Sequence, residues 1–499
     1  MAILSRRPRF AAPPWPDDHP DRRALDRRLD PDHLARRLDR AVDRLDLSAL
    51  RQGYGGVGSA AYRPELLLKA VLYETRCGRH SPAQWRRDAR ESEPLRWLLR
   101  GGEPSRSCWY AFRDRSAGHL EGWNRQVLAA AVTEGLTAAA RGALDGTAVA
   151  ADASRRRLAD EAKLRRRGEE LDRAAAAAGG GAALPRPGWL APTPRGRRRQ
   201  RQGLRRAQAR LDELQRRNAG KRASKRQKRG RVVVSLSDPE AAVGRDKEGV
   251  YRPLYNVQLV DDLDSPLVLG YAVFAQPNDA GLLGPMARRL QEVFGCPIAV
   301  LLADSAYAGG ADLAAAEGAG VALYAPPPPD GAREAKQIPK REFVWLPAEQ
   351  AYRCPAGHRL EYAGSSRQRR SGTEAVQLHR YRCPPEHCRD CPLRARCTPN
   401  PDQGRTISRS EHEELTEALR ARMGTAEAKG LYRLRKQTVE LVNADWKEHR
   451  KLRRFSGRGL GRARGQVGVM VLAHNLLSLL AHEQKAEKSS AAKPPEIAA

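Results

Sequence analysis

The stretch Leu144–Val149, Leu-Asp-Gly-Thr-Ala-Val, places one carboxylate, Asp145, among the apolar residues typical of a buried strand. A second apolar run, Ile298–Ala303, is followed directly by Asp304, so we expect that carboxylate at the C-terminal end of a strand. A third carboxylate, Glu440, lies in a segment with helical spacing. Two aspartates on strands and one glutamate on a helix can hold two divalent metal ions about 3.5–4 Å apart, the arrangement used for in-line phosphoryl transfer.

Each carboxylate has a plainer interpretation when it is taken alone. An Asp-Gly-Thr sequence is usually a turn, and a single helical glutamate usually faces solvent. The combination of Asp145, Asp304 and Glu440 in three matching contexts favours a catalytic site. The neighbouring acids Asp152 and Asp279 are interpreted as structural.

The net charge indicates the kind of partner. Lysine and arginine number 90 against 59 aspartates and glutamates, which gives a formal net charge of +31. Such an excess suits a polyphosphate, because neutralising phosphates releases counterions. An arginine-rich coding bias would be the alternative, but the basic residues cluster between 195 and 229. Double-stranded DNA is therefore the expected partner.

The sequence also bears on location. No apolar run approaches the ~18 residues that a membrane-spanning helix needs, and residues 1–20 lack the apolar core of a signal peptide. We expect a cytoplasmic, nucleoid-associated protein with no membrane partner. Its eight cysteines should then remain thiols or metal ligands.

Composition and periodicity divide the chain into segments. We expect a disordered leader (1–19), a helical DNA-binding domain (20–140), a catalytic core (141–335 and 405–482) with a basic helical insertion (155–230), a Cys-rich insertion (336–404) and a disordered tail (483–499). A helical packing module with a solvated basic face is the alternative for 20–140. The basic insertion is typical of a helical hairpin or a partly disordered arm.

The order of elements in the core predicts the fold. Strand patterns at 255–260 and 267–274 follow the Asp145 strand, and a helix at about 282–293 precedes the Asp304 strand. With a terminal helix bearing Glu440, this is the order of a ribonuclease-H-like fold. We therefore predict an α/β core, a mixed sheet flanked by helices on both faces. A helix at 471–480, apolar nearly all round, should be buried in it.

The glutamate helix carries further candidate residues. Lys436, Glu440 and Lys447 are expected on one face of this helix, at i−4 and i+7 relative to the glutamate. An apolar face would be formed by Val439, Val442 and Trp446.

Five cysteines fall between residues 354 and 397, including a Cys-x₂-Cys pair. This spacing suits a tetrahedral Zn²⁺ site that staples a small, loop-rich insertion. The preferred ligands are Cys354, Cys388, Cys391 and Cys397. The competing ligands are Cys383, His358 and His387. Reduced thiols without metal are the alternative, and Cys77, Cys108 and Cys296 are interpreted as core residues.

Several short motifs, taken in order, resemble those of a known family. They are Tyr62–Lys69, Phe112-Arg113, Ser237–Ala241, Tyr255–Gln258, Pro277–Asp279, Ala303–Tyr307, the set Tyr432, Arg435, Glu440 and Lys447, and His474–Leu477. Over residues 60–480 the chain resembles the DDE transposases of bacterial insertion sequences, in the group with a cysteine-rich insertion between the second Asp and the Glu. It departs from their pattern in the segment Leu441–Trp446, where Phe-Gly is common, at Gly465-Gln466, where an acidic residue is expected, and at Leu254, where glycine is common.

The resemblance implies a function. Asp145, Asp304 and Glu440 would bind Mg²⁺ or Mn²⁺ and catalyse DNA cleavage and joining of 3′-hydroxyl ends to target DNA. Tyr432, Arg435 and Lys447 would contact DNA phosphates. Pairing of the element's ends implies a homodimer or a larger assembly on DNA. A decayed transposase that only binds DNA, and a metal-dependent nuclease that never joins strands, are the alternatives.

Overall fold

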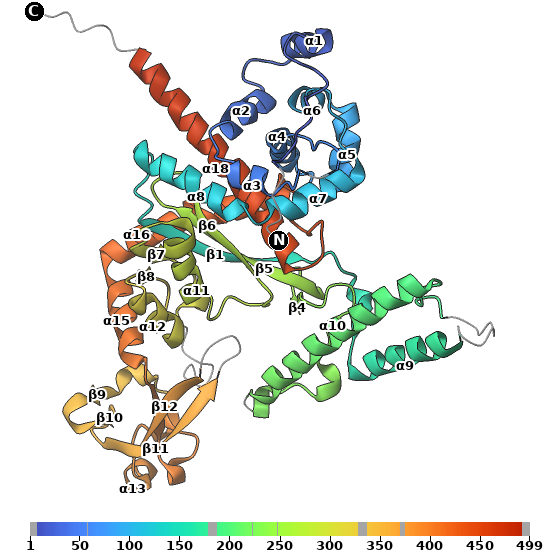
Figure 1. The fold of residues 1–499 in the computed structure, drawn as a ribbon. Coiled ribbons are helices and arrows are strands. Elements are labelled where there is room, and N and C mark those ends of the chain that lie inside the picture. Colours follow the sequence, from blue (N-terminus) through green and yellow to red (C-terminus); the bar gives the residue numbers. More distant parts are fainter. Residues whose placement is uncertain are drawn as a thin grey trace, which may run out of the picture.

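The protein was analysed as a computed structural model. It describes residues 7–56, 58–177, 187–221, 223–246, 248–327, 337–369 and 375–491. Within these ranges the chain is a mixed α/β protein with an N-terminal group of helices and mixed sheets (Figure 1).

The N-terminal group consists of short helices around an apolar centre. They are α1 (Pro20–Arg28), α2 (Leu34–Val42), α3 (Ser48–Gln52), α4 (Pro64–Arg76), α5 (Pro82–Glu91), α6 (Glu93–Leu98), α7 (Arg106–Ser116) and α8 (Leu120–Thr133). Proline in the first turn of α4 and a capping box at Ser81 and Gln84 of α5 explain where those helices begin.

The expected disorder of the leader is wrong for residues 7–19. The backbone N–H of Ala11 donates to Ala61 (2.8 Å) and that of Trp15 donates to Arg100 (2.9 Å). The Trp15 side chain is 9% exposed and belongs to the main apolar core. A single buried tryptophan therefore holds the leader against the helices, which composition alone does not reveal.

The central sheet has six strands in the described residues, with the order β4-β5-β1-β7-β8 and β6 paired to β5. The strands are β1 (Arg141–Ala150), β4 (Ala242–Arg245), β5 (Tyr251–Asp262), β6 (Val268–Phe274), β7 (Val300–Leu302) and β8 (Ala322–Tyr324). β1, β7 and β8 run parallel, whereas β4, β5 and β6 are antiparallel to their neighbours. β4 is not among the strands predicted from the sequence. It pairs with the N-terminal part of β5, residues 251–254, whereas β6 pairs with residues 256–261.

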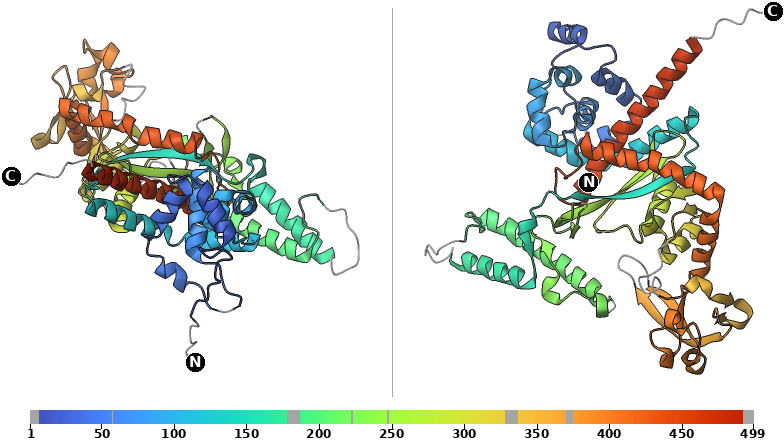
Figure 2. Two further views of the ribbon diagram at one scale, coloured as in Figure 1. Left: turned by 90° about the horizontal axis from the view of Figure 1, so that it is seen from above. Right: turned by 180° about the vertical axis from the view of Figure 1, so that it is seen from behind.

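Helices cover both faces of this sheet (Figures 1 and 2). One face meets α8, α18 (Leu460–Ala491), α11 (Leu283–Arg288) and the π-helical turn η4 (Arg289–Phe294). The other face meets α17 (Val439–Glu448), which packs on β1 and β5 and follows α16 (Ala426–Gln437). Leu144 belongs to the first core, and Ala143 belongs with Val439 to the second. Successive strand residues face opposite sides, so Asp145 lies on the α17 side. At the β8 end, α12 (Gly310–Gly318) and α15 (Glu413–Gly424) complete the layers.

The helix expected at 471–480 is part of the much longer α18, whose Val471 and Leu472 are fully buried. By length and composition, Leu460–Lys485 could cross a membrane, but 72% of the window that passes this test is buried inside the protein, as in a core helix. The expected disorder from residue 483 is wrong as far as 491. Alanine, glutamate and lysine favour continuation of the helix there, and Glu483 pairs with Arg44.

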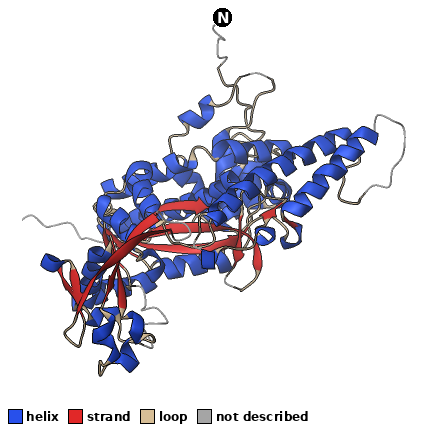
Figure 3. Ribbon diagram, turned by 90° about the horizontal axis from the view of Figure 1, so that it is seen from below, coloured by secondary structure: helices blue, strands red, loops and turns tan. Residues whose placement is uncertain are grey.

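The basic insertion forms a helical hairpin, hereafter the arm, which projects from the core (Figure 3). It comprises η1 (Arg155–Arg157), β2 (Leu158–Ala159), α9 (Glu161–Ala177), α10 (Pro194–Ala219), η2 (Ala223–Lys225), η3 (Arg229–Arg231) and β3 (Val234–Ser235). Its own small core includes Leu164, Ala207 and Leu211.

The Cys-rich insertion is built on a sheet, so the expectation of a loop-rich segment is wrong. Its five described strands have the order β13-β12-β11-β10-β9. They are β9 (Val344–Leu346), β10 (Ala351–Arg353), β11 (Arg359–Arg369), β12 (Ala375–Arg382) and β13 (Thr406–Ser410), with short helices α13 (Pro385–Arg389) and α14 (Arg394–Cys397). Because β13 pairs with β12, the sheet extends past residue 404, the expected end of the insertion.

Candidate functional site

The three carboxylates come from three elements that meet on one side of the sheet. Asp145 lies within β1, and Asp304 follows β7. The parallel register pairs Ala143 with Leu302, and each aspartate lies two residues beyond that pair. Asp304 begins the short helical turn η5 (Ser305–Tyr307) and accepts the N–H of Ala306 at 2.8 Å. Glu440 lies in the first turn of α17.

One guanidinium joins two of these carboxylates. Arg435 lies 2.8 Å from Asp145 Oδ1 and 2.9 Å from Glu440 Oε1. The Arg435 and Asp145 side chains are 10% and 15% exposed, whereas Glu440 is 48% exposed. The Arg435–Asp145 pair is therefore largely shielded from water, and the contact with Glu440 is open to it.

Asn443 completes the environment of Asp145. Its amide donates to Asp145 Oδ2 at 2.8 Å, and the residue is 7% exposed. Asn443 lies in the segment Leu441–Trp446, where the resemblance leads one to expect Phe-Gly. Asp145 thus has a cationic partner at one oxygen and an amide donor at the other.

The predicted continuous glutamate helix is wrong, because Thr438 (φ −114°, ψ −99°) separates α16 from α17. Lys436 and Glu440 consequently do not share one helical face. In an unbroken helix, Arg435 and Asn443 would be about 12 Å apart along the axis. The break lies between them, and both contact the same carboxylate. The predicted apolar face is present, since Val439 and Trp446 are buried.

A polar layer lies on the opposite face of β1, beside Gly146. Asp279 Oδ1 accepts from Gln258 Nε2 at 2.7 Å and from Asn256 Nδ2 at 2.8 Å, and Tyr307 donates to Gln258. A Cβ on Gly146 would lie 2.0 Å from Asp279 Oδ1. Only glycine fits beside this layer, and the acceptor role of Asp279 agrees with its structural interpretation.

Asp261 is a buried carboxyl that the sequence reasoning did not identify. It lies on β5 opposite Ala143, on the same face as Asp145, and it is 3% exposed. Neither of its carboxyl oxygens has a hydrogen-bond partner among the described residues. Burial raises the pKa of Asp261 well above its usual value, and the charges of Asp145 and Asp262 raise it further. The only sequence signal is an acid after a strongly apolar strand.

Tyr432 precedes Glu440 on α16, and Lys447 follows it on α17. Burial raises the pKa of Tyr432; Arg435 opposes this effect, while Asp304, Glu440 and Asp145 add to it. Tyr432 therefore lies within the electrostatic field of all three carboxylates. Lys447 is partly buried on α17, seven residues after Glu440.

The donor chemistry of the site suits a hard divalent cation, for which carboxylate oxygens are the preferred ligands. Among the described residues, however, no three histidine, cysteine, aspartate or glutamate side chains gather closely enough to hold a metal ion. The Arg435 guanidinium supplies positive charge at the place where a cation between Asp145 and Glu440 would supply it.

The cysteines of the insertion surround a second site, a small cavity. It is lined by Cys354, Cys383, Cys388, Cys391, Cys397, His358 and His387, so the preferred and competing ligands all meet there. The two imidazole rings stack with centroids 4.5 Å apart. All five thiols are free, and thiols and imidazoles are the ligands that a soft cation such as Zn²⁺ prefers. As at the carboxylates, no three of these described side chains lie close enough together to hold an ion. Of the cysteines interpreted as core residues, Cys296 is buried, whereas Cys77 and Cys108 are partly exposed.

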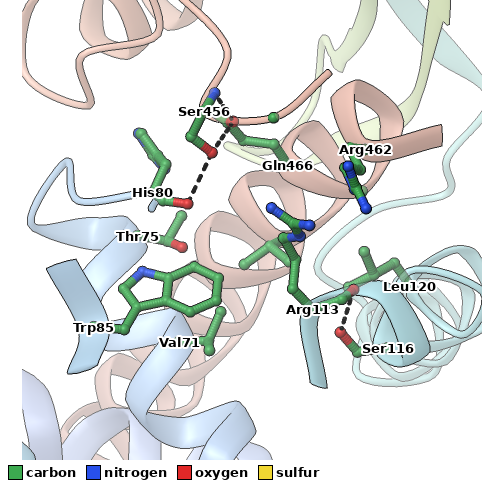
Figure 4. A pocket seen from close by; sticks show the side chains of 13 residues that line it. Val71, Thr75, His80, Trp85, Arg113, Ser116, Leu120, Ser456, Arg462 and Gln466 are labelled. Atoms are coloured by element: carbon green, nitrogen blue, oxygen red, sulfur yellow. Dashed lines mark hydrogen bonds between the residues drawn. The ribbon is translucent and has the colours of Figure 1, made fainter. Parts of the chain in front are cut away.

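A different cavity lies where the N-terminal helices meet α18 (Figure 4). Gln466 Oε1 accepts from both the backbone N–H and the hydroxyl of Ser456, at 3.0 and 2.9 Å, and the Ser456 hydroxyl lies 2.9 Å from the His80 carbonyl oxygen. Gln466 thus serves as an acceptor where the resemblance leads one to expect an acid.

Two family models match parts of the chain. A model described as "Transposase DDE domain" matches residues 353–480, which include the cysteine cavity, Arg435, Glu440 and most of α18. A second, described as "Transposase domain (DUF772)", matches residues 23–115 in the N-terminal helices. No curated protein matches the chain. The two matches support a DDE transposase of the insertion-sequence type, an enzyme that acts on DNA. Asp145 and Asp304 lie outside both matched segments.

Proposed function

We propose that the protein is a DNA transposase that binds the ends of a mobile element, cleaves there and joins the freed 3′-hydroxyl ends to target DNA. The observation that carries the proposal is the convergence of Asp145, Glu440 and Arg435, with Asp304 at the matching level of the neighbouring parallel strand. The order β6-β5-β1-β7-β8, with β5 antiparallel to β1, supports a ribonuclease-H-like core.

Asp145, Asp304 and Glu440 would hold Mg²⁺ or Mn²⁺. When bound, the metals would activate water or a 3′-hydroxyl for attack on phosphorus and stabilise the leaving oxygen. The chain's own residues then have positioning roles. Asn443 orients Asp145 through its 2.8 Å hydrogen bond. Arg435, Tyr432 and Lys447 would contact DNA phosphates, for which a guanidinium is well suited because it can bind two oxygens at once.

A structural Zn²⁺ would occupy the cysteine cavity, with Cys354, Cys388, Cys391 and Cys397 as the preferred ligands. Support comes from the gathering of all the candidate thiols in one place although they span more than forty residues of sequence. Such a metal would join α13 and α14 to the strand end at Cys354.

Double-stranded DNA, as element ends and as target, is the proposed partner, with the N-terminal helices as one binding surface. Pairing two ends would require at least a homodimer on DNA. A decayed copy that binds without chemistry and a nuclease that cuts without joining are the competing functions, and the test below separates them.

The test is cleavage and strand joining on duplexes that carry the element's end, with Mg²⁺, by wild type and by Asp145→Ala, Asp304→Ala and Glu440→Ala. Asp18→Ala, which changes an exposed acid of the leader, is the matched control. We expect each of the three variants to lose both reactions and keep DNA binding, and the control to behave as wild type.

Other results lead elsewhere. Binding without chemistry by the wild type would favour the decayed form, and cutting without joining would favour the nuclease. Cutting that survives all three substitutions would mean that the active site is elsewhere.

A further inference from the structure

The arm carries a strongly asymmetric charge. Helix α10 contains ten arginines and two acidic residues, whereas the adjoining α9 contains five basic and four acidic residues. A general arginine bias in the coding sequence would affect both helices alike. Of these two helices, α10 therefore carries nearly all of the excess positive charge.

The arginines of α10 lie on its outer face. Seven of them are exposed, and five of these lie in the N-terminal half of the helix: Arg195, Arg198, Arg199, Arg205 and Arg206. At 100° per residue, these five fall within about 120° of the helix circumference. The buried Leu211 lies on the opposite side, toward the arm's small core. The apolar face thus fixes the orientation of the arginines.

These five arginines have no ion-pair partner among the described residues. Some other basic residues of the arm are paired: Arg201 lies 2.5 Å from Asp172, Arg210 lies 2.6 Å from Glu213, and Arg229 lies 2.7 Å from Glu161. Like charges at i, i+3 and i+4 repel and weaken a helix. A stripe of unpaired guanidinium groups therefore destabilises the helix, and an anionic partner would reduce that repulsion.

We propose that this outer face of α10 binds the phosphate backbone of duplex DNA, independently of base sequence. From Arg195 to Arg206 the helix rises about 16 Å, which matches about five phosphates of one strand. Helix α10 has no aromatic residue. Single-strand binders usually stack bases on aromatic side chains, so its chemistry favours a duplex. The choice of DNA rests on the proposed function.

The position of the arm fits a contact away from the chemistry. The arm and the Cys-rich insertion extend from opposite ends of the central sheet, away from the N-terminal helices (Figures 1 and 2). Arg210 ties the arm to the core through the Ala275 carbonyl oxygen, 3.5 Å away. DNA held by the arm would be a second segment, separate from any duplex on the N-terminal helices.

The test uses the full chain and a random-sequence duplex, with affinity measured by fluorescence anisotropy from 0.05 to 1 M salt. The variant changes Arg198, Arg199, Arg205 and Arg206 together to glutamine. Losing four phosphate contacts should lower the slope of log affinity against log salt by up to about 3.6. If affinities converge at 1 M, this slope predicts a loss on the order of 10²-fold at 0.2 M salt. The matched control changes the same four residues to lysine and should keep the slope.

Unchanged affinity and slope in the glutamine variant would overturn the proposal, as would an equal loss in the lysine variant. Thermal unfolding of the glutamine variant should occur at no lower temperature than that of wild type, because the changed side chains are exposed and their mutual repulsion is relieved. The outcome is separate from that of the proposed function. If the wild type neither cleaves nor joins DNA, the transposase proposal is contradicted even if the arm binds DNA. If the wild type is active but the glutamine variant binds DNA as tightly and with the same salt dependence, only the proposal about the arm is contradicted.

Discussion

Replacing Arg435 by glutamine should destabilise the protein when divalent metal is absent, and destabilise it less when metal is present. In the structure this guanidinium is the cation between Asp145 and Glu440, at 2.8 and 2.9 Å. Glutamine cannot supply the charge. Without metal, the two carboxylates would then repel each other with no cation between them.

The expected size follows from burial. Removing one partner of a buried ion pair costs about 3–5 kcal/mol, whereas an exposed pair contributes about 0–1 kcal/mol. The Asp145 contact is the shielded one, and Asn443 still donates to that carboxylate. We therefore expect a loss of about 2–4 kcal/mol in the free energy of unfolding without metal. Metal at one hundred times its dissociation constant stabilises a protein by about 2.7 kcal/mol. Because the variant lacks the competing cation, it should gain more from metal than wild type.

The assay is guanidinium chloride unfolding of both proteins in EDTA and in saturating Mn²⁺. The matched control is Arg433→Gln, which removes an exposed arginine two residues away on the same helix and should change stability by less than about 0.5 kcal/mol. A gap between wild type and Arg435→Gln that is the same with and without Mn²⁺ would refute the idea that Arg435 and the metal stabilise the same carboxylates.

Three further predictions concern other residues. Asp261→Asn should flatten the dependence of the free energy of unfolding on pH. Because the pKa of Asp261 is raised in the folded protein, the free energy of unfolding of wild type should fall as pH rises above about 4, and asparagine cannot ionise. Denaturant midpoints from pH 4 to 8 measure this, and an unchanged profile would contradict a buried neutral carboxyl. Asn443→Leu should cost about 1–3 kcal/mol by removing a hydrogen bond from shielded Asp145, and should slow strand joining more than it weakens DNA binding; equal effects on both would argue against a positioning role. Cys388→Ser should reduce the zinc content measured by atomic absorption, whereas Cys77→Ser, outside the cavity, should not; equal zinc in both would place the metal elsewhere.

Elements with strong local patterns could be predicted from the sequence. The apolar run of β1 is interrupted by Asp145, and that of β7 is followed by Asp304. The existence of both strands and the strand-end position of Asp304 could therefore be predicted from the pattern alone. The grouping of the cysteines could also be expected from their spacing. Nothing in a local pattern, however, reports which side chain neutralises Asp145.

The remaining features depend on contacts between distant residues. The leader is held by Trp15, whose ring closely approaches Gly101; a Cβ at that glycine would lie 2.5 Å from the ring. The sheet of the Cys-rich insertion has mostly half-exposed strands, among them the three-residue β9, and such strands give a weak apolar signal. Threonine can occur within a helix, so the sequence does not reveal that the helix is broken at Thr438. The break accompanies the contacts of Arg435 and Asn443 with the same carboxylate, that of Asp145.

The charge balance at the carboxylates bears on how DNA would approach. Asp145, Asp304 and Glu440 together would repel a phosphate backbone if nothing neutralised them. Arg435 lowers that repulsion with a charge from the chain itself, and it does so at two of the three carboxylates. On the proposed function, a metal that binds Asp145 and Glu440 competes with this guanidinium. With a metal held by these carboxylates, Arg435 would be available to a phosphate oxygen, so one arginine would serve the resting site and the DNA-bound site in turn. The Mn²⁺ dependence predicted for Arg435→Gln is the consequence of this exchange that can be measured without any DNA.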